Sequence, residues 1–574
     1  MTLRNGAVLT HPAATATTRS SLVLNITGQL RIDGTSRIDV SGRGFLGGRS
    51  GDNTADEGRT LGNVPGSTRR NGGSYGGLGG PGNVPGVSNP VYGDFRDPNL
   101  PGSGGASEGG AGGNGGGVLR ITADSLVLDG EIAADGGNGV GRVAAGGSGG
   151  AIRIDVGTIA GAGTIHANGG EGNGGGFEAG GGGGGRIALY YDEAGGFDLS
   201  RITAFGRRGP FALDGGAGTV FVKAADRTFG DLVVDSAGGN PASATPLYSL
   251  LGGTSTELAP NALTDATADF IPGTLIGLEL NPNRMQGKTF TVIANDATTL
   301  FTDPADGDMT EVAGPGDTYG GEPVLDRLQV SSHARLEVVD GDQNRPDRRG
   351  LLTATDLMLV DEARLEHPAA TLASFFGLEI DVSGTLSIDE TSRIDVSGRG
   401  FLGGRSGDNT ANEGRTLGNV PGSTRRNGGS YGGLGGTGNV AGVSNPVYGD
   451  PRNPNEPGSG GASESGAGGN GGGLIRLVAG AIQLDGEIAA DGGDGVGLSA
   501  AGGSGGAIRI DAGTLAGTGT IHADGGKGHG GAGGGGGGGR VAVYGASALD
   551  PADITAAGGT GFQPGEPGTV VVEP

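Results

Sequence analysis

The chain contains no cysteine and no tryptophan, and only 4% of its 574 residues are aromatic. Without cysteine there is no disulfide framework, and no thiolate can act as a nucleophile or metal ligand. No run of about 18 apolar residues occurs, so the sequence predicts no helix that spans a bilayer. Residues 1–18 lack the apolar core of a signal peptide, so an export signal lies elsewhere or the sequence is an excerpt of a longer protein.

Positive charge is also in short supply. Lysine and arginine number 38 against 62 aspartate and glutamate residues, which gives a net charge of −24 and an isoelectric point of about 4.6. A field of this sign opposes binding to nucleic acid and to anionic membranes, and it favours solubility and divalent cations. We therefore expect no nucleic-acid partner and no membrane insertion.

Glycine is the residue that the chain has in excess. Glycine (135 residues) and proline (27) together make up about 28% of the sequence. This composition is typical of low-complexity, disordered chains. Any ordered fold must therefore be argued from pattern, because composition alone favours disorder.

A long internal duplication organises the chain. Residues 35–94 recur as residues 391–450, with three differences in 60 positions: Asp56 becomes Asn412, Pro81 becomes Thr437, and Pro85 becomes Ala441. Two copies of a glycine-rich repeat thus occupy 1–224 and 354–574. An unduplicated spacer, 225–353, separates them, and the second copy stops where another spacer would begin, as in a window cut from a tandem array.

Strict apolar alternation marks short strands with one buried face. It is clearest at Leu22, Leu24 and Ile26 and at Ile152, Ile154 and Val156. Such strands are too narrow to form a core alone, but stacked as rungs they bury a continuous apolar column. The sequence predicts an all-β fold, a parallel β-helix or β-solenoid. A β-sandwich is the competing fold, but it would call for more aromatic residues and regular hairpin turns.

The glycine tracts require a separate explanation. Residues 109–117 read Gly-Gly-Ala, Gly-Gly-Asn, Gly-Gly-Gly, and 169–185 contains 12 glycines in 17 residues. An extended helix of three residues per turn has no internal hydrogen bonds, and only glycine fits where such segments crowd together. We therefore predict polyglycine-like lobes whose segments exchange backbone hydrogen bonds with their neighbours. Flexible loops are the alternative for each tract.

Two regions depart from the rung pattern. Between Ser41 and Gly117 lies an excursion with little strand signal, which we interpret as a packed lobe pinned by aromatic residues and as the most plausible binding surface. These aromatic residues are Phe45, Tyr75 and Tyr92. In the spacer, about 254–320 predicts a small inserted β module with strands at 275–280, 288–295 and 298–303.

The glycine-rich motifs carry a resemblance. Gly-Gly-Ser-Tyr-Gly-Gly at 72–77, Tyr-Gly-Asp at 92–94 and Pro-Gly-Ser-Gly-Gly at 101–105, followed by a strand, resemble the glycine-rich, adhesin-like repeats of giant secreted or cell-surface bacterial proteins of β-helix type. The resemblance covers both copies and leaves out the inserted module. It implies surface exposure, adhesion or filament formation, and it brings no catalytic residues.

Catalysis is the main rival function. Solenoid enzymes that act on acidic polysaccharides as lyases or hydrolases require clustered carboxylates beside a basic residue. Here Arg153 and Asp155 alternate with buried positions, as do Arg37 and Asp39. Adjacent outward charges of this kind predict a solvated face with weak ion pairing. We therefore expect no catalytic site and no enzyme.

Calcium is the one cofactor that the residues suggest. Aspartates crowd the excursion, and their oxygens are ligands that calcium accepts. The candidate ligands are Asp52 and Asp94 in the first copy and Asp408 and Asp450 in the second, accompanied by Asp56, Asp97, Asn412 and Asn453. A second candidate set is Asp303, Asp306, Asp308 and Glu311. The six histidines are scattered singly without zinc spacing, which predicts surface or turn positions.

These observations lead to one functional expectation. The chain is expected to be a structural or adhesive repeat region of a large extracellular or cell-surface protein, with itself as partner in end-to-end fibres or with surface glycans as ligands. The alternatives are a polysaccharide-acting solenoid enzyme and a calcium-dependent glycan-binding module.

Overall fold

A computed structural model of the chain describes residues 1–173, 179–209 and 214–574. Strands make up 38% of the chain and helix 3%, so the all-β prediction is confirmed. The helical segments among the described residues are single 3₁₀ turns at Leu61–Asn63, Leu199–Arg201, Pro304–Asp306, Met309–Glu311, Leu417–Asn419 and Pro551–Asp553. None of them is long and apolar enough to cross a membrane.

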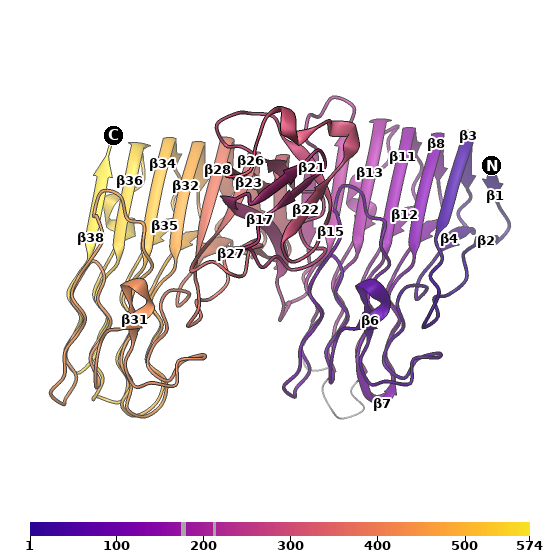
Figure 1. The fold of residues 1–574 in the computed structure, drawn as a ribbon. Helices are drawn as coiled ribbons and strands as arrows, with labels where there is room; N and C mark the ends of the chain where they lie inside the picture. The colour runs from indigo at the N-terminus through magenta and orange to yellow at the C-terminus, as the bar shows by residue number, and fades with distance from the viewer. Residues whose placement is uncertain (174–178, 210–213) are drawn as a thin grey trace.

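One 14-stranded sheet runs the whole length of the molecule, with the two termini at opposite ends (Figure 1). We call it the long sheet. Its strands, in spatial order, are β1 (Thr2–Leu3), β3 (Leu22–Ile32), β8 (Val118–Leu128), β11 (Ala151–Ala160), β13 (Arg186–Glu193), β15 (Thr219–Ala224), β16 (Asp231–Asp235), β24 (Val324–Ser331), β26 (Asp347–Val360), β28 (Phe375–Ile388), β32 (Leu474–Leu484), β34 (Ala507–Ala516), β36 (Arg540–Ser547) and β38 (Thr569–Glu573).

Shorter strands form a second layer, because the chain alternates between the two layers as it advances. In the first copy this layer is β14 (Ile202–Thr203), β12 (Thr164–His166), β9 (Glu131–Ala133), β4 (Arg37–Asp39) and β2 (Val8–Leu9). Further along it is β17 (Thr245–Thr254), β25 (Arg335–Asp340), β27 (Arg364–Glu366), β29 (Arg393–Asp395), β33 (Glu487–Ala489), β35 (Thr520–His522) and β37 (Ile554–Thr555). Within each of these two groups of second-layer strands, neighbouring strands are parallel. None of the sheets in the described residues is closed.

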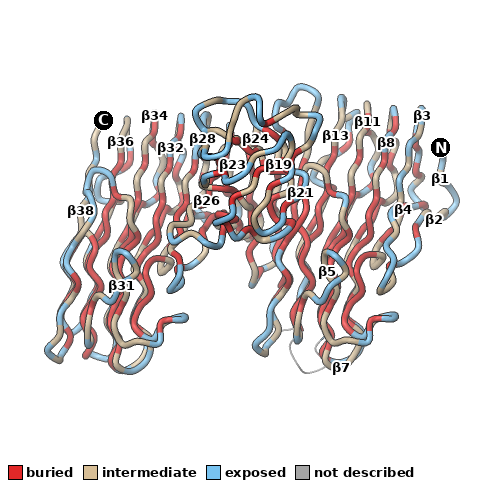
Figure 2. The backbone as a smooth tube through the Cα atoms, in the orientation of Figure 1, coloured by how far each residue is buried: buried red, intermediate tan, exposed pale blue. Residues whose placement is uncertain are grey.

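The core lies between the two layers and is built from stacked, identical positions. Ile121, Ile154 and Leu189 are register partners on successive strands of the long sheet, and all three are fully buried. Each strand alone presents one narrow row of apolar side chains to the core, so burial depends on the strands above and below it. Figure 2 shows the buried residues continuing along both layers and down into the glycine-rich segments.

The glycine-rich segments are packed by backbone hydrogen bonds with a period of three. Along residues 145–150, successive N–H groups donate to three different neighbouring segments in turn. The pairs are Ala145 to Ala106, Gly146 to Gly180, Gly147 to Gly137, Ser148 to Ser103, Gly149 to Gly183 and Gly150 to Ala134, at 2.7–3.1 Å. This is the period of an extended helix with three residues per turn. The predicted exchange of hydrogen bonds is confirmed here; residues 174–178 of the tract 169–185 lie outside the described residues.

The excursion of the first copy is likewise a packed lobe. Phe45, Tyr75 and Tyr92 are buried and form a cluster with Val118 and Ala151, and the two tyrosine rings lie 4.9 Å apart. The predicted role of these three aromatic residues is therefore confirmed. Short two-stranded pairs complete the two lobes: β5 (Arg59–Thr60) with β6 (Val64–Pro65), β7 (Ser107–Ala111) with β10 (Val140–Ala144), and β30 (Arg415–Thr416) with β31 (Val420–Pro421).

The spacer carries an antiparallel module with its own core. Its strands are β18 (Glu257–Ala259), β19 (Ala262–Thr264), β20 (Glu279–Asn281), β21 (Phe290–Asn295), β22 (Thr299–Thr302) and β23 (Thr318–Glu322). The predicted strand at 275–280 is wrong in its bounds. Gly277 has φ of +87°, which interrupts an extended strand, so β20 begins only at Glu279.

The direction of the long sheet reverses once, at an antiparallel hairpin between β15 and β16. Cross-strand partners point to the same face of a sheet. The pair Phe221 and Leu232 belongs to the core that continues through the second copy, whereas Val220 and Val233 pack with the core of the first. The hydrophobic core therefore moves from one face of the sheet to the other at this hairpin, which the sequence analysis did not predict.

Candidate functional site

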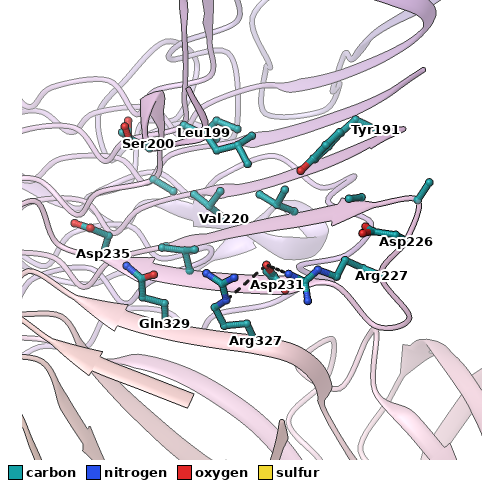
Figure 3. A pocket seen from close by; sticks show the side chains of 18 of the residues that line it. Tyr191, Leu199, Ser200, Val220, Asp226, Arg227, Asp231, Asp235, Arg327 and Gln329 are labelled. Carbon is teal, nitrogen blue, oxygen red and sulfur yellow. Dashed lines mark ion pairs between the residues drawn. The ribbon is translucent and has the colours of Figure 1, made fainter. Parts of the chain in front are cut away.

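A cavity of about 850 Å³ opens at the junction between the first copy and the spacer. Its walls come from β13, β14, β15, β16 and β24 and from the hairpin turn at 225–230 (Figure 3). Val220, Val222 and Val233 form an apolar floor, with Leu199 and Tyr191 at the sides. We call this the junction cavity.

The junction cavity follows directly from the change of core face. Among the described residues, β14 is the last strand in the second layer of the first copy, and no further strand of that layer covers β15 and β16. On the opposite face, Phe221 and Leu232 are covered by the second core and are fully buried. The side chains of Val220, Val222 and Val233 that face the first copy are left beside open space.

The rim of the junction cavity is charged. The carboxylate of Asp231 lies 3.9 Å from Arg227 and 3.9 Å from Arg327, as Figure 3 shows. Its Oδ1 is buried without a hydrogen-bond partner among the described residues. Burial raises the pKa of Asp231, and the two arginines oppose that shift. A ligand whose apolar part rests on the valine floor would place its polar atoms within reach of this carboxylate.

Two adjacent residues on β16 test this geometry. We expect Val233→Phe to leave stability unchanged or to raise it by up to about 1 kcal/mol, because the ring enters open space. We expect Val234→Phe to lower the free energy of unfolding by about 1–3 kcal/mol, because Val234 is fully buried on the opposite face. Urea denaturation measures both. Equal losses in the two variants would contradict a core that changes face at this hairpin.

Each copy also contains a histidine held between two carboxylates, which we call a histidine clamp. In the second copy, His522 lies 2.9 Å from Asp491 through Nδ1 and 2.8 Å from Glu487 through Nε2. In the first copy, His166 is 2.9 Å from Asp135 and 2.7 Å from Glu131. The prediction of surface or turn positions for the histidines is wrong for these two, which are half-buried in β12 and β35. The surface expectation also fails at His11 and His367, which are buried.

The signal that could have revealed the clamps is the spacing of the rungs. His166 lies 31 residues after Asp135 and 35 after Glu131, and strands β9 and β12 are register neighbours. The pairing of neighbouring strands in the second layer therefore brings together residues that lie 31 and 35 positions apart in the sequence. Local spacing rules for metal ligands cannot detect such a contact.

The clamp in the second copy includes a third carboxylate. Asp491, His522 and Asp524 have their ligand atoms within 4.8 Å of one another; Asn168 takes the place of Asp524 in the first copy. Asp524 already accepts hydrogen bonds from Thr555 Oγ1 and from the N–H of Ala557. Both imidazole nitrogens face carboxylates, the arrangement of a protonated ring that donates twice.

The clamps predict a loss of stability at alkaline pH. Burial alone would lower the pKa of His522, but Asp491 and Glu487 raise it to about 10. Because the folded pKa lies above the ordinary value of 6.5, this stabilisation is complete below pH 6.5 and is lost as pH rises toward 10. The change should be a few kcal/mol, since one pKa unit corresponds to about 1.4 kcal/mol.

Urea midpoints at pH 6 and pH 9.5 test this dependence. In His522→Gln the difference between the two midpoints should shrink, and His333→Gln, at a half-buried residue 3.5 Å from Glu362, should retain it. An unchanged difference in His522→Gln would show that the clamp does not contribute.

The four aspartates predicted to bind calcium each accept a backbone hydrogen bond. Both carboxylate oxygens of Asp52 accept the N–H of Ala16, at 3.0 and 3.1 Å. Asp408 accepts the N–H of Leu372 in the same way. None of the four predicted ligands belongs to the group of three candidate ligand side chains found among the described residues.

The remaining predicted ligands are held by local contacts. Asp94 is buried, which raises its pKa, and it accepts the N–H of Arg96 at 2.7 Å; Asp450, its counterpart, is exposed. The other excursion residues contact arginines: Asp56 with Arg49, Asp97 with Arg120 and Arg153, Asn412 with Arg405, and Asn453 with Arg476 and Arg509. In the second candidate set, Asp303 and Asp308 cap the 3₁₀ turns that contain Asp306 and Glu311.

The ion pairs expected along the strands are present, one on β11 of the long sheet and one on β4 of the second layer. Arg153 lies 2.9 Å from Asp155, and its guanidinium also stacks 4.6 Å from the ring centroid of Tyr190. Arg37 and Asp39 are 3.4 Å apart. Because Asp97 bridges Arg120 and Arg153 from the excursion, these charges fasten the lobe to the sheet.

Comparisons of this chain with protein-family models, with curated proteins and with solved structures find no match.

Proposed function

We propose that this chain is a structural and adhesive repeat region of an extracellular or cell-surface protein, built as a β-solenoid. The observation that carries the proposal is the long sheet, which joins both copies and the spacer in one continuous stack of strands. In such a stack each repeat contacts only its neighbours, so length can grow without a new kind of core. An elongated scaffold of this sort suits a protein that keeps other domains apart or presents a binding surface.

The glycine-rich lobes support the same proposal. Their segments are joined to three neighbours by backbone hydrogen bonds, as residues 145–150 illustrate. Stiffness then depends on main-chain contacts more than on side-chain packing. Exposed surface remains free for partners, and surface glycans are the ligand class that we propose for an acidic, polar exterior.

The ends of the long sheet provide a route to fibres. β1 and β38 are its terminal strands, and unpaired strand edges are templates for further pairing. The N–H of Thr569 donates to Gly539. Because backbone groups alternate along a strand, the N–H groups of Val570 and Val572 point toward the open edge.

Electron microscopy and sedimentation velocity of the purified chain test end-to-end assembly. We expect elongated particles that associate through their ends, and Val572→Pro should abolish association, because proline removes an edge donor. Val572→Thr is the matched control and should still associate. Only dispersed particles of the unmodified chain, with and without calcium, would contradict fibre formation.

A further inference from the structure

The spacer docks on the lobe of the first copy through a small set of polar contacts. The N–H of Gly93 donates to the carbonyl of Gly273 at 3.0 Å. The guanidinium of Arg96 donates to the carbonyl of Gly277 at 2.6 Å and to that of Val324 at 2.9 Å. Main-chain carbonyls of the spacer therefore meet one arginine and one glycine of the lobe.

The two surfaces fit closely because glycine stands at two of the three contact points of the spacer, Gly273 and Gly277. A Cβ on Gly277 would lie 2.2 Å from Oδ1 of Asp94, and one on Gly273 would lie 2.7 Å from Leu61. Both glycines have positive φ, +79° at Gly273 and +87° at Gly277, so the spacer loop is shaped for this approach. Val91 and Tyr92, next to the contact, are almost completely buried.

In the part of the chain that the structure describes, the second copy presents the same residue types without a spacer docked on them. Leu417, Val447, Tyr448, Gly449, Asp450 and Arg452 correspond to Leu61, Val91, Tyr92, Gly93, Asp94 and Arg96 of the first copy. Val447 is 48% exposed, whereas Val91 is fully buried. Leu417 is 48% exposed, and the side chain of Arg452 is 67% exposed and pairs with Glu573.

We propose that Leu417 and residues 447–452 form a second docking surface, whose partner is the spacer of a second copy of this chain. The occupant follows from the equivalent surface in the first copy, where identical residue types hold residues 273–277 of the spacer. One residue inside the surface differs: Phe95, which packs 5.6 Å from Phe221, corresponds to Pro451. Binding at the second docking surface therefore relies on the arginine and the backbone contacts.

The full chain tests this proposal in trans once its inserted module is detached from the first lobe. Arg96→Glu removes the donors that hold Gly277 and Val324, so the module, which carries residues 273–277, should leave its own lobe and bind the second docking surface of another molecule. Sedimentation velocity, in the Val572→Pro background that blocks edge pairing, should then show dimers or larger species. The double variant Arg96→Glu with Arg452→Glu should remain monomeric. A monomeric Arg96→Glu chain whose spacer exchanges amide hydrogens rapidly would overturn the proposal.

A tandem extension, in which residues 225–574 are repeated after residue 574, tests the same surface in cis. Amide hydrogens at 447–452 should exchange at least about tenfold more slowly in the extension than in the parent chain. Arg452→Ala should restore fast exchange there and leave the parent unaffected. Equal exchange in both chains would overturn the proposal. Because the readout is local protection, its failure is distinct from a failure of the chain to form fibres.

Discussion

Replacing Gly149 by valine is expected to cause one of the largest losses of stability in this chain, at least about 3 kcal/mol. A Cβ at this position would lie 2.0 Å from the carbonyl oxygen of Ala167 and 2.5 Å from the nitrogen of Gly185. Both atoms belong to backbone that is itself hydrogen-bonded, so neither can move without breaking contacts to further segments. Urea denaturation followed by circular dichroism measures the loss.

Two matched variants make the result specific. Gly505 is the equivalent residue of the second copy, with a Cβ position 1.9 Å from the carbonyl oxygen of Ala523, so Gly505→Val should cause a comparable loss. Nothing lies within 4 Å of a Cβ on Gly314. Gly314→Ala should therefore be neutral or stabilise the chain by up to about 1 kcal/mol. If Gly149→Val behaved like Gly314→Ala, the lobes could not be close-packed.

Truncating Phe221 to alanine is the second large effect, with an expected loss of about 3–5 kcal/mol. The ring is fully buried, 5.6 Å from Phe95 and 5.8 Å from Tyr190. From its place on β15, the Phe221 ring covers the first residues of the core that continues through the second copy. The variant should therefore also weaken the coupling between the two copies. Denaturation monitored by fragment-resolved hydrogen exchange should show the copies unfolding at separate urea concentrations.

Val222→Ala is the control for that experiment. Val222 lies one position further along β15 on the floor of the junction cavity and is only partly buried. Its truncation should be less destabilising, about 1 kcal/mol, because the site is already open. Equal losses at Phe221 and Val222 would place the core on both sides of β15 and would contradict the change of face.

Much of the fold could be predicted because it depends on local pattern. The alternation at Ile152, Ile154 and Val156 appears as the inner face of β11, and all three side chains are buried. The aromatic residues of the excursion, Phe45 and Tyr75, are buried as predicted. These inferences succeed because side-chain period and glycine phasing reflect contacts that repeat at every rung.

The functional features were less accessible. The histidine clamps join residues from different rungs, and the spacer contacts of Arg96 reach across 181 and 228 residues. The predicted calcium ligands illustrate the converse, since Asp52 and Asp94 lie within one excursion but serve separate hydrogen bonds. Composition identified the residue types, whereas only the path of the chain assigns their partners.

The sequence by itself determined that the chain is all-β and that it is duplicated, and it predicted, with flexible loops as the alternative, that its glycine tracts pack by backbone contacts. Only the tertiary structure decided which face of the long sheet carries the core. The physical reason lies at the junction, where Val220 and Phe221 on β15 and Leu232 and Val233 on β16 are all apolar. An alternating pattern cannot choose a face when both faces are apolar, so the hairpin pairing makes that choice.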